Sequence, residues 1–225
     1  PNNQALRPDL DIGTCSVPSL SSTWQTYGWR DWAITDDERA FGILSAYRGQ
    51  NGVQYHRIVE WDIRHPLAWK CISSYDVSTG GYGDYTAISY DRTRDSIWVN
   101  HGVRKSVIQY EFDGNGGFDR NSTDYYTYFM SSGQVRGMSV HGDVFWFRTY
   151  QTWNSDNLEC FAITGTPGSV LTKQTGTTSI SANGYGLDYD GQRLNTLDHY
   201  SWTQGQRYRE FGSGISYLIT AQPGT

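Results

Sequence analysis

The sequence predicts an all-β protein, a small β-propeller of about four four-stranded blades with a repeat of about 50 residues. Three observations support this prediction. The chain is 15% aromatic and only 18% charged, with 25 glycines, and it is poor in the residues that favour helices. Short runs of β-branched and aromatic residues alternate with Gly, Asn and Asp turns. These turns recur at a nearly constant spacing.

The clearest unit lies in the middle of the chain. Four β-rich runs are separated by turn residues, at 84–91, 96–101, 106–113 and 124–129. Each run is long enough for one strand of a sheet. Four strands in about 50 residues is what one propeller blade requires.

The same order of runs and turns recurs along the chain. The first turn of each unit falls at Asp37, Asp91, Gly142 and Gly191, in steps of 54, 51 and 49. The third strand of the first three units is expected to end at Asp62, Asp113 and Thr164, in two steps of 51. Aspartate and glycine suit these positions because tight hairpins need a positive φ or a side chain that bonds its own backbone.

The predicted blades cover residues 29–78, 82–130, 133–178 and 182–225, after an N-terminal segment of residues 1–28. The strand-like run 23–27 in that segment is a candidate for the outer strand that closes the ring against the last blade, or for part of a fifth blade. A β-sandwich or barrel is the main alternative fold, although it needs no fifty-residue period. A β-helix would have shorter and more uniform coils.

Composition and charge exclude several classes of binding partner. The net charge of −5 provides no electrostatic footprint for nucleic acid. No apolar run approaches the roughly 18 residues of a membrane helix, so membrane insertion is not expected. The first residues, Pro1 to Asn3, do not look like an initiator start, and we expect a mature or excised piece. Cys15, Cys71 and Cys160 lack the spacing of a metal or redox motif. They are interpreted as small residues packed in strands, although two of them can pair.

Candidate binding residues follow from the loops, where propellers carry their sites. The positions just after the second strand of each unit are expected to hold aromatic, imidazole or guanidinium groups, namely Tyr47, Arg48, His101, Arg148, Tyr150, His199 and Tyr200. Such groups stack on sugar rings and donate hydrogen bonds. Trp153 and Trp202 lie in polar stretches and are further candidates for exposed binding residues. Trp98 and Trp146, by contrast, are predicted to pack between blades.

Signals for catalysis are weak. The five histidines lie on different units and show no metal-ligand spacing, and no nucleophile elbow or phosphate-binding glycine loop occurs. Most carboxylates fall at turns, where geometry explains them. A lyase that pairs His101 with Tyr150, or His199 with Tyr47, is the enzymatic alternative. We therefore predict no catalytic residues, no metal and no cofactor.

The Tyr-, Trp-, Gly-, Ser- and Thr-rich repeats over residues 29–220 resemble, in a general way, the propeller modules of secreted lectins and of bacteriophage tail or host-recognition proteins. This resemblance implies an extracellular or virion-surface module that binds surface glycans without cleaving them. A structural or receptor-binding particle component, acting through protein contacts as a homo-oligomer or within a larger assembly, is the second hypothesis. A polysaccharide lyase or hydrolase is the third.

Overall fold

The computed structural model describes most of the chain from residue 24 onward. The described residues are 24–48, 53–65, 69–76, 85–101, 105–112, 118–119, 125–128, 135–152, 155–174, 178–180, 183–189, 191, 194–201, 205–211 and 218–220. Within strands at several sheet ends, the backbone is described and the side chains are not. The N-terminal residues 1–23 and the candidates Trp153 and Trp202 lie outside the described residues.

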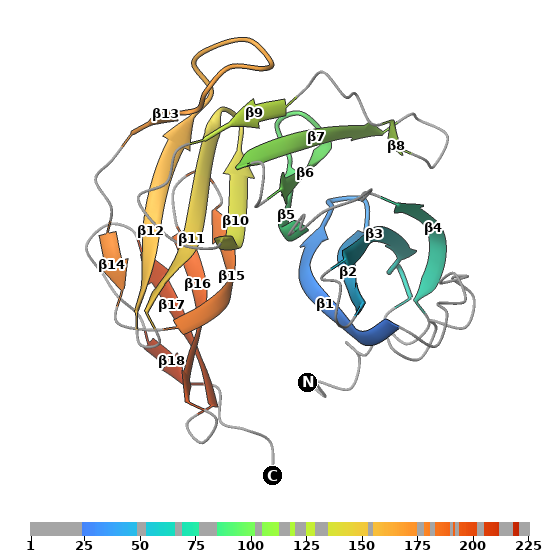
Figure 1. Cartoon of the computed structure of the whole chain (residues 1–225), viewed down its shortest axis with the longest axis horizontal. Coiled ribbons are helices and arrows are strands. Elements are labelled where there is room, and N and C mark those ends of the chain that lie inside the picture. Colours follow the sequence, from blue (N-terminus) through green and yellow to red (C-terminus); the bar gives the residue numbers. More distant parts are fainter. Residues whose placement is uncertain are drawn as a thin grey trace.

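Within these residues, four antiparallel sheets follow one another along the chain (Figure 1). The first contains β1 (Trp24–Ile34), β2 (Arg39–Arg48), β3 (Val53–Asp62) and β4 (Lys70–Asp76). The second contains β5 (Tyr85–Asp91), β6 (Ser96–His101) and β7 (Ser106–Phe112), with β8 (Phe118–Asp119) and β9 (Tyr125–Thr127) both paired to β7. The third contains β10 (Val135–His141), β11 (Val144–Thr152) and β12 (Ser155–Ala162), with β13 (Thr172–Lys173) and β14 (Thr178–Ile180) paired to β12. The fourth contains β15 (Asn183–Tyr189), β16 (Leu194–Ser201), β17 (Gly205–Phe211) and β18 (Leu218–Thr220).

Each sheet is a meander with four strand positions, the arrangement of a propeller blade. In the second and third sheets two short strands share the fourth position. The first strands of successive sheets pack against one another, β1 on β5, β5 on β10 and β10 on β15. The predicted all-β propeller fold is confirmed, and these four first strands are its innermost strands.

The strand-like run near the N-terminus belongs to the first sheet. Residues 24–27 form the start of β1, and Tyr27 pairs with Ala46 of β2. The run therefore neither closes the ring against the last sheet nor begins a fifth blade. β1 is 11 residues long and contains a β-bulge between Trp29 and Trp32.

The last two turns after innermost strands have positive φ at the predicted glycine, whereas in the first two turns positive φ falls on Glu38 and Asp95 and not on the predicted Asp37 and Asp91. Each contains one described residue with positive φ, at Glu38 (61°), Asp95 (49°), Gly142 (56°) and Gly191 (94°). The left-handed region is costly for most L-residues and free for glycine. The regular steps in the sequence thus mark the four hairpins that turn the chain away from the centre.

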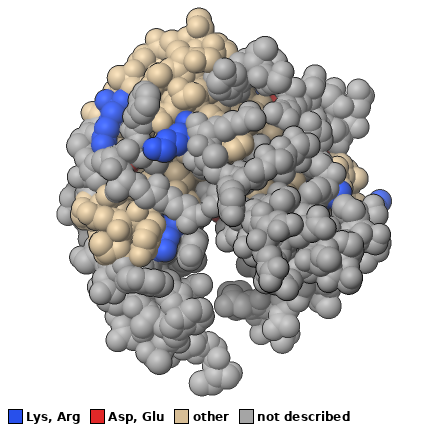
Figure 2. Space-filling model, in the orientation of Figure 1, with Lys and Arg blue, Asp and Glu red and all other residues tan. Residues whose placement is uncertain are grey.

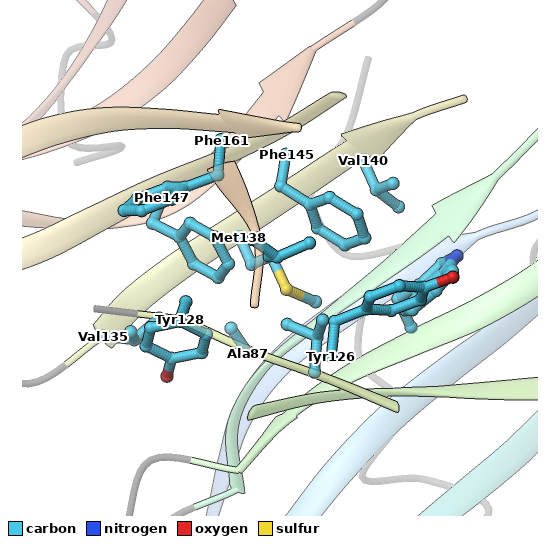
Figure 3. Close-up of a cluster of buried hydrophobic side chains, with 12 residues drawn as sticks. Ala87, Tyr126, Tyr128, Val135, Met138, Val140, Phe145, Phe147 and Phe161 are labelled. Carbon is cyan, nitrogen blue, oxygen red and sulfur yellow. The ribbon is translucent and has the colours of Figure 1, made fainter. Parts of the chain in front are cut away.

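Apolar side chains fill each interface between successive sheets. Figure 3 shows the largest cluster, where Met138, Phe145 and Phe147 of the third sheet face Ala87 and Tyr126 of the second. Trp98 belongs to this cluster and is completely buried, with its ring 5.0 Å from Phe145. Trp146 packs between the third and fourth sheets, beside Leu194 and Tyr189. Both tryptophans therefore pack between blades, as predicted.

The cysteines differ from the simple expectation of packed thiols. Cys71 on β4 is disulfide-bonded, whereas Cys160 on β12 is free and buried. Cys15 lies outside the described residues. Burial raises the pKa of the Cys160 thiol to about 11, so this thiol is poorly reactive in the folded protein.

The described surface provides two further observations. None of its segments is a helix long and apolar enough to cross a membrane. On the face seen in Figure 2, the described Lys and Arg side chains lie in separate patches rather than in one continuous surface.

Candidate functional site

Side-chain oxygens join the innermost strands at every described interface between sheets. The Ser89 Oγ on β5 accepts a hydrogen bond from the Val140 N–H on β10, at 3.1 Å. The Ser139 Oγ on β10 accepts one from the Tyr189 N–H on β15, at 2.8 Å. Because a backbone N–H buried without a partner is costly, these bonds fix how each strand lies against the next.

Asp31 has the same role between the first two sheets. Its Oδ1 accepts from the Trp32 N–H at 2.9 Å and its Oδ2 from the Ile88 N–H at 3.1 Å. Burial removes water from this carboxyl and raises its pKa to about 7, although the two N–H groups act in the opposite direction. The first interface thus depends on a group that titrates near neutral pH.

The turns that follow the innermost strands are also bonded to their neighbours. Arg92 lies 2.9 Å from Asp36 of the first sheet, and both side chains are 60% exposed. Arg94 bonds Asp91 within its own sheet and reaches Asp143 in the next sheet. These contacts hold one rim of the propeller together.

A pocket of about 360 Å³ opens where the four innermost strands end. All four sheets contribute to its wall, through Trp32, Ala33, Ile34, Thr35, Ile88, Ser89, Tyr90, Arg92, Val140, His141, Leu187, Asp188 and Tyr189. Its volume lies within the range of about 300–1,000 Å³ that is typical of small-molecule sites. The pocket is the candidate functional site.

Two aromatic side chains of the wall are held by contacts outside the pocket. The Trp32 ring packs 4.9 Å from Trp61. The Tyr90 hydroxyl donates to Asp95 at 2.8 Å, and burial together with this carboxylate raises its pKa above the usual range. Because these contacts fix the rings without a ligand, the aromatic wall is preformed.

The fourth sheet supplies the remaining aromatic group. The Tyr189 hydroxyl donates to the Gly191 carbonyl at 2.8 Å, and its ring meets the His141 ring edge-on at 6.2 Å. A Cβ at Gly191 would come within 2.8 Å of the His141 ring. Glycine at this turn therefore leaves the space that His141 occupies.

The residues predicted from the sequence lie at the other end of the same strands. Tyr47 and Arg48 are the last residues of β2, and His101 is the last residue of β6. His199 and Tyr200 lie in β16. These second strands run antiparallel to the innermost strands, so their last residues face the start of β1, β5 and β15. All five lie within strands instead of after them. The side chains of Tyr47, Arg48, His199 and Tyr200 lie outside the description.

Arg148 and Tyr150 differ most from the expected exposed loop. Both lie within β11. Arg148 is completely buried, and its Nε lies 2.8 Å from Asp156 Oδ2 on β12, which is also completely buried. Tyr150 is half-buried, with the guanidinium of Arg136 4.3 Å from its ring centre. His101 is buried as well. The packing of β11 against β12 explains why the Arg148 guanidinium is not at the surface.

The pocket residues were not among the sequence candidates. They do share a signal: Tyr90 and His141 directly precede the first turn of their sheets, and Tyr189 lies two residues before Gly191. The fifty-residue period predicts the positions of these turns. It therefore also predicts where the first strands end. The sequence candidates were instead the aromatic and basic residues after the second strands, which lie at the opposite end of the sheets.

Comparison with known proteins supplies no family. No family model matches the chain, and no curated protein matches it. Solved structures show distant similarity to β-propeller proteins. Hsv2 from Kluyvelomyces marxianus aligns with a TM-score of 0.44 and 12% identity over 88% of this chain, which spans only 50% of the Hsv2 chain. A protein from Lactobacillus plantarum aligns with a TM-score of 0.42 and 8% sequence identity, over 86% of this chain and 84% of that protein. A chain of a nidogen/laminin complex aligns with a TM-score of 0.40 and 11% sequence identity, over 86% of this chain and 79% of that chain.

Proposed function

We propose that this chain is a non-enzymatic recognition module that binds surface glycans in the pocket at the ends of its innermost strands. The observation that carries the proposal is the pocket itself, with three preformed aromatic groups, Trp32, Tyr90 and Tyr189, around about 360 Å³. Aromatic faces pack on the apolar faces of sugar rings, while their polar tips and neighbouring groups bond hydroxyls.

The number of carboxylates in the wall favours binding over glycoside cleavage. Glycoside hydrolases generally need two carboxyl groups, one on each side of the scissile bond. Among the described wall residues, only Asp188 carries a carboxyl group. An assay for reducing ends or unsaturated products on any bound glycan tests the enzymatic alternative directly.

The proposal includes a secreted or virus-particle location, in line with the general resemblance of the repeats to lectin and phage host-recognition modules. The disulfide at Cys71 supports an oxidising compartment. Thiol titration of the protein purified without reductant tests this part. We expect no fast-reacting thiol in the native protein and one after unfolding, since Cys160 is free and buried. Three thiols after unfolding would contradict it.

A glycan array with the labelled chain tests binding, and a blocking variant tests the site. Ile34 lines the pocket and is 56% exposed, so Ile34→Trp adds bulk there at little expected cost in folding. Ile72 on β4 is 44% exposed and lies outside the wall, which makes Ile72→Trp the matched control. Loss of binding in Ile34→Trp alone supports the pocket.

The sequence candidates provide the opposing test. If Trp153→Ala or Trp202→Ala abolishes binding while Ile34→Trp retains it, the glycan site lies elsewhere and the pocket assignment is wrong. If the native chain binds no glycan on the array, the proposal fails, and a structural or protein-receptor role through a larger assembly takes its place.

A further inference from the structure

The hydrogen bonds between innermost strands follow a repeat. Ser89 and Ser139 pair across their hairpins with Trp98 and Trp146, respectively. In both cases the serine Oγ accepts a backbone N–H from the innermost strand of the following sheet. The acceptor position is thus one fixed step of the repeat, and it recurs after 50 residues.

Asp188 occupies this step in the fourth sheet. It pairs with Asn195, which follows buried Leu194 as Trp98 follows buried Ile97 and Trp146 follows buried Phe145. Tyr189, the residue after Asp188, donates to Ser139, as Val140 after Ser139 donates to Ser89. Asp188 is therefore the next acceptor in the series, 49 residues after Ser139.

Unlike the two serines, Asp188 is bonded to no following strand among the residues that the structure describes. Its side chain is exposed, it lines the pocket, and within the described part of the chain no hydrogen bond or ion pair reaches it. A carboxylate thus faces the pocket at a position where the fold elsewhere provides a donor.

The charges around the pocket leave this carboxylate uncompensated. Arg92 is the one described wall residue that carries a guanidinium or ammonium group, and it is paired with Asp36 at 2.9 Å. Asp95, beside Tyr90, is a further acid at this rim and accepts the Tyr90 hydroxyl. A ligand ammonium group would gain a charge-assisted hydrogen bond here, stronger than one from a neutral hydroxyl.

From this arrangement we infer that Asp188 is the specificity residue of the pocket and that it selects amine-bearing sugars, in which a protonated amino group supplies the missing donor. This inference rests on the proposed glycan-binding function and narrows it to one chemical class. The aromatic wall holds the sugar ring, and Asp188 distinguishes a free amine from an acetylated one.

The test compares two hexasaccharides that differ only at nitrogen, β-1,4-linked glucosamine and β-1,4-linked N-acetylglucosamine, by titration calorimetry. We expect the amine form to bind about tenfold tighter, a difference typical of one hydrogen bond to a charged group. Asp188→Asn keeps the size of the side chain and should remove that preference. Glu111→Gln removes the same charge from an exposed position on β7 and should leave the preference unchanged, which controls for general attraction to a cationic oligosaccharide.

The outcomes separate the two proposals. Equal affinity for both hexasaccharides, or an unchanged preference in Asp188→Asn, overturns the inference while glycan binding stands. A preference lost equally in Glu111→Gln also overturns it, because the attraction is then general. If neither hexasaccharide nor any glycan on the array binds, the proposed function itself fails.

Discussion

The two ends of the innermost strands carry similar residue types but bury them to different degrees. Where β1, β5, β10 and β15 end, Arg92 and Asp36 form an ion pair in which both side chains are 60% exposed. Near the start of β10, Arg148 and Asp156 form one of nearly the same length in which both are completely buried. The comparison teaches that a guanidinium beside an acid marks a binding surface only where water reaches it. One end is built as a polar core and the other as an open pocket.

The largest test of this difference removes the two arginines in turn. Arg148→Ala leaves the Asp156 carboxylate buried without its 2.8 Å partner, and we expect a loss of about 3–5 kcal/mol in the free energy of unfolding. Arg92→Ala should cost at most about 1 kcal/mol, because water screens the exposed pair. Urea denaturation measures both. Similar losses in the two variants would contradict the division into a structural end and an open end.

The second test uses the titration of Asp31 at the first interface. Because its pKa of about 7 lies above the ordinary aspartate value of 3.8, the folded state binds one extra proton between these two pH values. Its contribution to stability is complete below pH about 4 and is lost as the pH rises through about 7. Between these pH values the free energy of unfolding falls by up to about 1.4 kcal/mol per pH unit.

Asp31→Ser places at this interface the residue type that the other two interfaces use. We expect the difference in unfolding free energy between the variant and the native chain to shift in favour of the variant as the pH rises from about 4 to about 8. Urea denaturation across this range provides the measurement. A difference that is constant with pH would show that Asp31 titrates as an ordinary exposed aspartate.

Much of the fold could be predicted because short segments of the sequence determine its turns and strands. Gly142 and Gly191 adopt positive φ, and the Asp91 side chain accepts the Thr93 N–H at 3.0 Å, so the spacing of these turn residues indicates the blades. Trp98 and Trp146 were predicted as core because each lies in the middle of an apolar strand. These inferences require nothing from distant parts of the chain.

The candidate site could not be predicted in the same way, because exposure depends on partners distant in sequence. Arg148 looked like a loop residue, but its guanidinium is buried beside Asp156 on the neighbouring strand. Asp188 has no local sequence signal that sets it apart from the other carboxylates. What distinguishes it is the absence of a following strand beside it in the described structure, whereas Ser139 has Tyr189. Sequence periodicity predicts the repeated position, but it does not show that Asp188 lacks, among the described residues, the following strand that Ser139 has.

A third test concerns how the turn at Gly191 shapes the pocket. Gly191→Ala introduces a Cβ at φ +94° that would meet the His141 ring at 2.8 Å, so we expect a loss of about 2 kcal/mol together with weaker ligand binding. Gly168→Ala has nearly the same φ, +91°, and open space around the added atom. It should cost about 1 kcal/mol and leave binding unchanged. Equal effects on binding would mean that the position of His141 does not matter to the site.

A small effect on stability is expected from Ser139→Ala, which removes the acceptor of the Tyr189 N–H. The cost should be about 1 kcal/mol, the typical contribution of one hydrogen bond, and Ser74→Ala at an exposed position on β4 should cost less. The effect on ligand affinity should be larger than this stability change suggests, because the lost bond fixes the strand that carries both Tyr189 and Asp188 into the pocket. Unfolding midpoints and titration calorimetry on the same samples separate the two quantities. If affinity falls no more in Ser139→Ala than in Ser74→Ala, the hydrogen bonds between innermost strands serve the fold alone, and the pocket does not depend on the register of its fourth wall.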